Sequence, residues 1–500
     1  MKRESGILLP IFSLPSPYGI GCFSKEAYEF VDQLKEAGQS YWQILPLGPT
    51  SYGDSPYQSF STFAGNPYFI SLDELVEEGV LTREECDAAN FGRSRSTIDY
   101  AKLYKNRYPL LRKAYERSRV WENEDFLQFR RENGWWLRDY ALFVAVKDRF
   151  GGKAWTEWAE DIRLRWNNAM EYYQKELYYE IEFHEYLQYL FLRQWEKLKA
   201  YANSQGIRII GDIPIYVAMD SADTWANPEL FQLDQDNVPL AVAGCPPDGF
   251  SATGQLWGNP LYRWDYHRNT GYQWWISRMS YCFRLYDVVR IDHFRGFDEY
   301  FSIPYGDKDA RGGHWEKGPG IDLFRKIEQA LGWKQVIAED LGYMTDSVRH
   351  LVYESGFPGM KVLEFAFDSR DSGCASDYLP HNYPENCVAY TGTHDNETIV
   401  GWWKSITAAE RKLARDYLCD HATPEEELYK CFISLIMRSA ARVCVIPMQD
   451  YMGLDNRFRM NKPSTVGTNW KWRIKKRDLT KKLQKEIYDV TLRYGRKNWD

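Results

Sequence analysis

The sequence predicts an α/β fold, a (β/α)8 TIM barrel with subdomains inserted at the C-terminal face of its strands and no separate C-terminal β-domain. Three observations lead to this prediction. Eight short apolar runs recur along the 500 residues, and amphipathic helical stretches separate most of them. Such runs are typical of parallel strands that helices cover on both faces. Two intervals between runs are too long for simple strand-to-helix connections, which indicates insertions.

The eight predicted strands each end at or next to Gly, Pro, Asp or His. They cover residues 6–11, 40–46, 207–213, 287–292, 335–339, 361–367, 387–391 and 443–448. Helical periodicity marks stretches between them, among others residues 323–331 and 424–441. Eight strand–helix units favour a closed barrel. The alternative is an open doubly wound sheet, but Gly19-Ile20-Gly21 lacks the rest of the fingerprint by which such a sheet binds a dinucleotide.

Two segments are expected to be insertions into a single catalytic barrel that spans residues 1–500. Residues 67–205 are rich in Arg, Glu, Trp and Tyr with helical periodicity, so we predict a mainly helical insertion. Residues 215–285 are rich in Pro, Gly and Asn, so we predict a loop-rich insertion. Loops at the C-terminal face of a barrel build substrate clefts. We therefore expect 215–285 to form the cleft and residues 244–260 to act as its lid.

Composition narrows the class of protein. A net charge of −7 argues against a nucleic-acid partner, and no apolar run is long enough to span a membrane. The nine cysteines lack a CxxC pair and no signal peptide is evident, so we expect a cytoplasmic protein; a plastid form would require a transit peptide already removed. The histidines show no metal spacing, so we expect no metal and no cofactor. We expect a monomer or a weak oligomer.

Aromatic residues are abundant, with 20 Trp, 36 Tyr and 25 Phe. Most of them must belong to a large core. Some also suit a sugar cleft, because the apolar faces of sugar rings stack on aromatic planes while hydroxyl groups bond at the ring edges. Composition alone leaves both interpretations open.

Three carboxylates stand at or just after the ends of the fourth, fifth and seventh predicted strands: Asp292, Glu339 and Asp395. The C-termini of barrel strands converge on one mouth, so these side chains should become neighbours. Cleavage of a glycosidic bond with retention needs two nearby carboxyl groups, one as nucleophile and one as acid and then base. A single Asp at a strand end is more often a cap or a turn former, but three together favour a shared site.

Neighbouring residues refine the roles of these carboxylates. Arg290 lies two residues before Asp292 and therefore on the same side of the strand, where its charge would keep the nucleophile ionised. An interior ion pair is the structural alternative. Glu339 must begin protonated, as a desolvated carboxyl near other carboxylates would be. Asp340 competes for this role, but adjacent strand residues face opposite ways, and we favour Glu339.

Long segments of the chain resemble a known family over essentially its whole length. They include GILLPIFSLPSPYGIG, SPYQSFSTFAGNPYFI, GDIPIYVAMDSADTW, PPDGFSATGQLWGNPLYRW, RIDHFRG, VIAEDLG, THDNET and RMNKPSTVGTNWKWR. Together they resemble the 4-α-glucanotransferases (amylomaltases or disproportionating enzymes) of glycoside hydrolase family 77, in the α-amylase clan. NKPST departs from the Gly that follows Pro in some members.

The resemblance implies roles for particular residues. Asp292 would be the nucleophile, Glu339 the acid/base, and Asp395 the third carboxylate, which binds sugar hydroxyls and stabilises the distorted transition state. Residues implied in substrate binding are Tyr57, Asp212, Asp248, Gln255, Trp257, Arg290, His394 and Asn461. Among these, Tyr57 would stack on the reacting sugar and Trp257 would belong to the loop over the glucan. Tyr57, Trp257, Asp212 and His394 also have structural interpretations, as core aromatics, a cap or a packed histidine.

The resemblance also implies the reaction. Segments of α-1,4-glucan (maltooligosaccharides, starch or glycogen) would pass to glucose or to another α-1,4-glucan, without a catalytic metal. Strand ends and residue types alone favour retaining glycoside chemistry but do not choose between a sugar hydroxyl and water as acceptor. An α-amylase-type hydrolase and a non-catalytic glucan-binding protein are the two alternatives.

Overall fold

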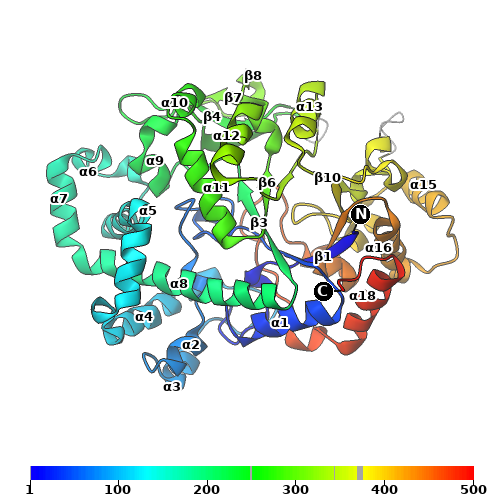
Figure 1. The fold of residues 1–500 in the computed structure, drawn as a ribbon, viewed down its shortest axis with the longest axis horizontal. Coiled ribbons are helices and arrows are strands. Elements are labelled where there is room, and N and C mark those ends of the chain that lie inside the picture. The colour runs from blue at the N-terminus through cyan, green and yellow to red at the C-terminus, as the bar shows by residue number, and fades with distance from the viewer. Residues whose placement is uncertain (1, 248–250, 343, 369–374, 500) are drawn as a thin grey trace.

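Eight parallel strands form the central barrel of the protein, for which a computed structural model describes residues 2–247, 251–342, 344–368 and 375–499. The strand order is β10-β11-β12-β1-β2-β3-β6-β9. All eight predicted strands are present, so the predicted fold class is confirmed (Figure 1). The strands are β1 (Glu4–Leu8), β2 (Tyr41–Gln43), β3 (Arg208–Pro214), β6 (Val288–Asp292), β9 (Val336–Ala338), β10 (Gly359–Val362), β11 (Cys387–Tyr390) and β12 (Val443–Pro447).

The barrel is nearly closed at the seam between β9 and β10. These two strands do not pair in a regular ladder. Instead, the Ala338 amide donates to the Pro358 carbonyl at 3.0 Å, and the Met360 amide donates to Oδ1 of Asp340 at 2.7 Å. Apolar side chains from every strand fill the interior: Leu8, Tyr41, Ile210, Val288, Ile337, Met360, Val362, Val388, Tyr390 and Val445.

Three predicted strands run three or more residues past the ends of the observed ones. The second was expected over 40–46, but β2 ends at Gln43. The first was expected over 6–11, but β1 ends at Leu8, and Pro10, which has no amide hydrogen to donate, precedes a 3-10 turn at Ile11–Ser13. The sixth was expected over 361–367, but β10 ends at Val362 and a 3-10 turn follows at Leu363–Phe365. An unbroken apolar run does not distinguish a buried strand from a buried turn that continues it.

Helices surround the barrel. Those that alternate with its strands are α1 (Lys25–Glu36), α8 (Tyr178–Ser204), α11 (Gln273–Leu285), α12 (Ile321–Leu331), α13 (Asp346–Ser355), α16 (Leu428–Arg438) and α18 (Lys481–Arg493). Shorter helices α14 (Ile399–Ser405), α15 (Ala408–Leu418) and α17 (Met448–Tyr451) complete the C-terminal half. Helix α1 presents Phe30, Val31 and Leu34 to the core at helical spacing, as its periodicity predicts.

Helices occupy most of the long connection between β2 and β3. They are α2 (Leu72–Glu77), α3 (Arg83–Ala88), α4 (Tyr100–Ser118), α5 (Glu124–Arg149), α6 (Glu160–Arg163) and α7 (Asn167–Glu176), and they gather on one side of the barrel (Figure 1). The 27-residue helix α8 leads from this group back to β3. Its Trp195 is fully buried and donates its indole N–H to the Leu285 carbonyl, which fastens α8 to α11.

The connection between β3 and β6 is more regular than the predicted loop-rich segment. It contains α9 (Ala222–Ala226), β4 (Ala241–Cys245), β5 (Gln255–Pro260) and α10 (Trp264–Asn269) before α11. Strands β4 and β5 join β7 (Glu299–Pro304) and β8 (His314–Lys317) in a four-stranded antiparallel sheet. Because β7 and β8 follow β6 in the chain, the local pattern of 215–285 does not reveal its partners.

The C-terminal segment is helical and returns to the first strand. Arg496 is 0% exposed, and its guanidinium donates to the carbonyls of Met437 at 2.7 Å, Ala441 at 2.8 Å, Ser439 at 3.0 Å and Glu4 at 3.1 Å. One buried side chain thus joins the end of α16, the approach to β12 and strand β1. A search of the described residues found no helix both long and apolar enough to cross a membrane.

Candidate active site

The three predicted carboxylates project from strand C-termini at one mouth of the barrel. Asp292 is the last residue of β6, Glu339 follows β9 directly, and Asp395 lies in the loop after β11. All three strands belong to the same parallel barrel. The structure therefore brings residues that are about 100 positions apart in sequence to one place, as the convergence of barrel strands requires.

Arg290 links the nucleophile candidate to a buried carboxylate. Its Nη1 lies 2.7 and 2.8 Å from the two carboxylate oxygens of Asp212 and 3.1 Å from Oδ1 of Asp292. Asp212 stands opposite Arg290 in the register of β3 and β6, which explains the paired contact. Asp212 is 0% exposed and Arg290 3%, whereas the Asp292 side chain is 30% exposed. Of the three, Asp292 is the one that faces the mouth.

Burial is the largest influence on Asp292 and raises its pKa, while the charge of Arg290 opposes the shift. For Glu339, burial and then the charge of Asp292 raise the pKa to about 7. Burial and the charge of Asp292 thus favour the protonated form of Glu339, whereas Arg290 beside Asp292 favours the ionised form of that carboxyl.

The Glu339 carboxyl is held from two directions by backbone amides. His293 donates its N–H to Oε2 at 2.7 Å, and Leu341 donates its N–H to Oε1 at 2.8 Å. His293 adopts a left-handed backbone conformation with φ of 53°, which non-glycine residues rarely do. That conformation aims the amide of the residue after Asp292 at Glu339, so the nucleophile candidate and the acid candidate are fixed relative to each other.

Asp395 is surrounded by donors. The side-chain amide of Asn461 donates to its Oδ1 at 2.6 Å, and Nε2 of His394 lies 3.3 Å from its Oδ2. Burial works to raise the pKa of Asp395, but His394 and Asn461 together lower it to about 2. For His394, burial works to lower the pKa, yet Asp395 raises it above the ordinary value. Each member of the pair thus favours the charged form of the other, the imidazolium of His394 and the carboxylate of Asp395.

Tyr57 connects this pair to the arginine cluster. Its hydroxyl donates to Oδ2 of Asp212 at 2.9 Å and lies 3.4 Å from Nδ1 of His394, whose ring its own ring stacks on at 5.0 Å. A continuous chain of polar contacts thus runs from Asp395 through His394, Tyr57, Asp212 and Arg290 to Asp292. The chain passes beneath the mouth and leaves only its two end carboxylates substantially exposed.

Strand β5 places the predicted loop residues over this site. The Trp257 indole donates to Oε1 of Gln255 at 3.1 Å, and its ring meets the His293 ring edge to face at 4.8 Å. Trp257 is therefore packed beside the residue that follows Asp292. Asp248, which was also predicted to line this region, lies outside the described residues.

Asp340, the competing acid candidate, is engaged elsewhere. Its carboxylate accepts the Met360 amide and bridges the barrel seam.

Two residues that contact the candidate site were not predicted from the sequence. One is His293, whose contribution depends on a backbone angle. The other is Arg459, which donates to the main-chain carbonyls of Asp395 at 2.6 Å and Asn461 at 2.7 Å. Its place in the RMNKPST segment was the available signal.

No group of three or more His, Cys, Asp or Glu in the described ranges is arranged to hold a metal ion. Arg290 supplies a positive charge beside Asp292, and the His394 imidazole and the Arg459 guanidinium lie beside Asp395.

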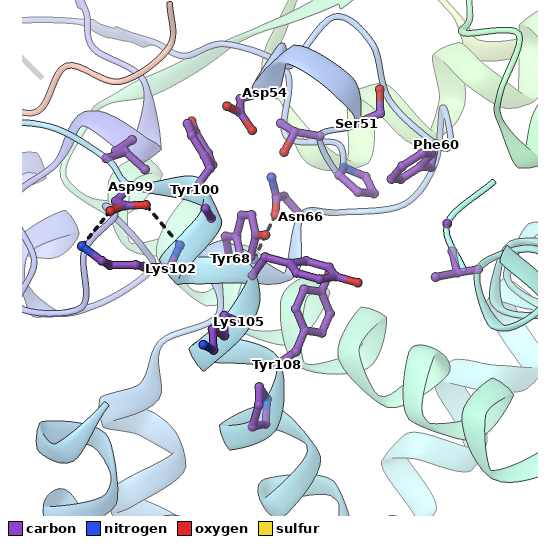
Figure 2. A pocket seen from close by; sticks show the side chains of 18 of the residues that line it. Ser51, Asp54, Phe60, Asn66, Tyr68, Asp99, Tyr100, Lys102, Lys105 and Tyr108 are labelled. Carbon is purple, nitrogen blue, oxygen red and sulfur yellow. Dashed lines mark hydrogen bonds and ion pairs between the residues drawn. The ribbon is translucent and has the colours of Figure 1, made fainter. Parts of the chain in front are cut away.

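A cavity of about 1310 Å³ lies between the 49–68 segment and helices α4, α5 and α8, and none of the three carboxylates lines it. Figure 2 shows Tyr68, Tyr100 and Tyr108 around it, with Asp99 paired to Lys102. Asp99 also accepts the Lys102 amide and so caps α4. The carboxyl groups with perturbed pKa values, which are typical of reacting sites, lie at the barrel mouth and not in this cavity.

Fold and site together define a (β/α)8-barrel enzyme of glycoside chemistry. Residues 9–480 match the glycoside hydrolase family 77 described as 4-alpha-glucanotransferase. The chain is 48% identical to a 4-alpha-glucanotransferase of Clostridium butyricum over 97% of this chain and 99% of that protein, and 47% identical to one of Thermus thermophilus over 95% of each. The chain belongs to the 4-α-glucanotransferases of glycoside hydrolase family 77, as its motifs implied.

Two solved structures of amylomaltases share the fold of this chain. An amylomaltase from Streptococcus agalactiae in complex with acarbose superposes with a TM-score of 0.96 at 43% identity, covering 99% of this chain and all of that one. An amylomaltase from Corynebacterium glutamicum, 20% identical, shares the fold with a TM-score of 0.80 over 99% of this chain and 75% of that chain.

Proposed function

We propose that the protein transfers segments of α-1,4-glucan to glucose or to another α-1,4-glucan by a retaining double displacement with a glycosyl-enzyme on Asp292. The observation that carries the mechanism is that two neighbouring carboxyl groups have different surroundings, one beside an arginine and one, among the described residues, without such a partner. Asp292 contacts Arg290 at 3.1 Å, while the pKa of Glu339 is raised to about 7 by burial and by Asp292. One group is thus a nucleophile and the other an acid at neutral pH.

In the first step Glu339 gives its proton to the glycosidic oxygen as the bond from that oxygen to the anomeric carbon breaks. An Asp292 oxygen forms a bond to the same carbon, and the reducing-end fragment leaves with the proton. The backbone amides of His293 and Leu341 then stabilise the Glu339 carboxylate that remains.

In the second step the Glu339 carboxylate takes the proton of an acceptor 4-hydroxyl. The acceptor oxygen bonds to the anomeric carbon, the bond to Asp292 breaks, and both carboxyl groups return to their initial states. Two inversions at one carbon give net retention.

Asp395 and the residues that donate to it bind the sugar that lies between Asp292 and Glu339. The imidazolium of His394 and the amide of Asn461 keep Asp395 ionised, so that it binds sugar hydroxyls and faces the positive charge that develops at the anomeric carbon. Tyr57 holds His394 and Asp212 and offers its ring to the sugar. Trp257 and Gln255, on the segment we assign to the cleft and lid, shield the glycosyl-enzyme from water and favour a sugar acceptor.

Incubation with maltotriose tests the proposal. We expect glucose together with a ladder of longer maltooligosaccharides, while the total number of reducing ends stays constant. A steady rise in reducing ends without a ladder would instead identify an α-amylase-type hydrolase. Mass spectrometry of peptides after denaturation during turnover should find a glycosyl group on Asp292; a ladder with no adduct there, under conditions that trap one elsewhere, refutes the assigned nucleophile.

A further inference from the structure

Arg290 has a third partner residue, to which the proposed mechanism assigns no role. Its Nε donates to the thioether sulfur of Met360, with 3.3 Å between nitrogen and sulfur. Met360 is 1% exposed and belongs to the apolar layer inside the barrel, on β10, two strands from β6. Sulfur is a weak acceptor, but a guanidinium buried inside a barrel finds few others.

The contact with Met360 fixes the orientation of the Arg290 guanidinium, which the contacts with the two carboxylates do not fix by themselves. Nη1 alone contacts both Asp212 and Asp292, so these contacts restrain one corner of the guanidinium. A second contact at Nε, another corner of the planar group, stops the whole guanidinium from sliding within its site. A guanidinium that slid would lengthen the 3.1 Å contact between Nη1 and Asp292 first, because Asp212 holds Nη1 with two oxygens.

Met360 is itself held in place from the active-site side. Its amide donates to Oδ1 of Asp340 at 2.7 Å, across the seam where β9 and β10 do not pair. Asp340 directly follows Glu339, so the acid/base strand anchors the residue that braces the arginine beneath the nucleophile. Asp292 and Glu339 are thus linked through the barrel interior by the contacts of Arg290, Met360 and Asp340.

We propose that Met360 is a positioning residue: its thioether accepts from Nε of Arg290 and keeps the guanidinium against Asp292, with Asp340 holding Met360 across the barrel seam. This proposal rests on the proposed role of Asp292 as nucleophile. It predicts that removal of the sulfur, with side-chain volume kept, weakens catalysis without weakening the fold.

Met360→Leu is the direct test, because leucine fills a similar volume and has no acceptor. Met437→Leu is the matched control, since Met437 is also fully buried but lies on α16 outside the barrel. We expect kcat for maltotriose to fall about tenfold in Met360→Leu, because the guanidinium then moves away from Asp292, with little change in KM. Met437→Leu should keep the wild-type kcat, and the two variants should unfold at similar temperatures.

The pH profile separates positioning from packing. The charges that act on Asp292 are those of Arg290, Asp212, Asp395, His394 and Glu339. Arg290 opposes the rise in the pKa of Asp292, so a misplaced guanidinium lets that pKa rise further, and the acid limb of kcat/KM should move to higher pH in Met360→Leu only. A crystal structure of this variant should show Nη1 farther from Asp292.

Equal kcat values and equal acid limbs in Met360→Leu and wild type overturn the inference. So does an equal loss in both leucine variants, because packing would then explain it. If wild type itself makes no ladder from maltotriose, the proposed function fails first, and the position of Arg290 in the Met360→Leu crystal still decides whether the thioether orients it.

Discussion

The raised pKa of Glu339 predicts an alkaline limit to the first chemical step. Burial and the charge of Asp292 raise that pKa from 4.5 to about 7. At pH 7 an ordinary glutamic acid would be about 0.3% protonated, whereas Glu339 is about half protonated. The shift therefore raises the concentration of active acid roughly 150-fold, equivalent to about 3 kcal/mol. Above pH 7 the acid form should fall about tenfold for each pH unit.

The assay compares two donors. kcat/KM reports the ionisation of the free enzyme and the steps up to glycosyl-enzyme formation. For maltotriose it should decline with a midpoint near pH 7, because the departing sugar oxygen needs a proton. For α-maltosyl fluoride it should not decline there, because fluoride departs without one. Glu339→Gln should lower kcat/KM for maltotriose by about 10²–10⁴ and affect the fluoride much less.

Two results would refute this reasoning. A profile for maltotriose that stays flat to pH 9 would mean that Glu339 does not lose its proton near pH 7 or is not the acid. An alkaline limb of the same midpoint with both donors would mean that another group, one needed for binding or folding, titrates there.

Three further predictions concern the surroundings of the pair. Asn461→Asp removes a donor from Asp395 and adds a second negative charge, so kcat should fall at least tenfold at pH 7; unchanged kcat would contradict the role of this contact. Trp257→Ala opens the site beside His293 and should admit water. The ratio of glucose released by hydrolysis to ladder products should therefore rise several-fold. A constant ratio would show that the indole does not exclude water. Arg496→Met removes the guanidinium donor from five main-chain carbonyls, two of which, those of Met437 and Ser439, keep a second donor in Arg3. The free energy of unfolding should therefore fall by about 3 kcal/mol in a urea titration while kcat per folded molecule stays constant. A loss of kcat at unchanged stability would contradict a structural role.

The barrel and the placement of three carboxylates at one of its mouths could be predicted from the sequence, because both depend on local or topological rules. Apolar runs mark buried strands, and parallel strands in a barrel bring their C-termini together, so Asp292, Glu339 and Asp395 could be grouped before any coordinates existed. Arg290 followed from the two-residue period of a strand. The structure adds the contacts that make this grouping chemically specific, such as the 3.1 Å between Arg290 and Asp292.

Other features depend on non-local pairing or on backbone angles, which the sequence pattern does not encode. Strand β5 pairs with β4, and β4 pairs with β7, which comes after β6, so the local pattern of residues 215–285 predicts loops. The amide of His293 reaches Glu339 only because φ is 53° there, a conformation that its residue type does not predict. Asp212 was expected to line the sugar subsite, but it is fully buried, and its observed contacts are with Arg290 and Tyr57.

The arrangement of charges explains why one site can serve both steps of the proposed cycle. Before reaction, three carboxylates (Asp212, Asp292 and Asp395) face two cations (Arg290 and His394), while Glu339 is neutral, which leaves one net negative charge. In the glycosyl-enzyme Asp292 is a neutral ester, but Glu339 has given up its proton, so the net charge is again one negative. A partly desolvated site that kept its charge constant would avoid the large cost of charging a low-dielectric region, and the single negative charge would stabilise the oxocarbenium-like transition state of each step. Glu339 completes this balance only if its pKa lies near neutral pH, which is why its burial beside Asp292 matters as much as its position.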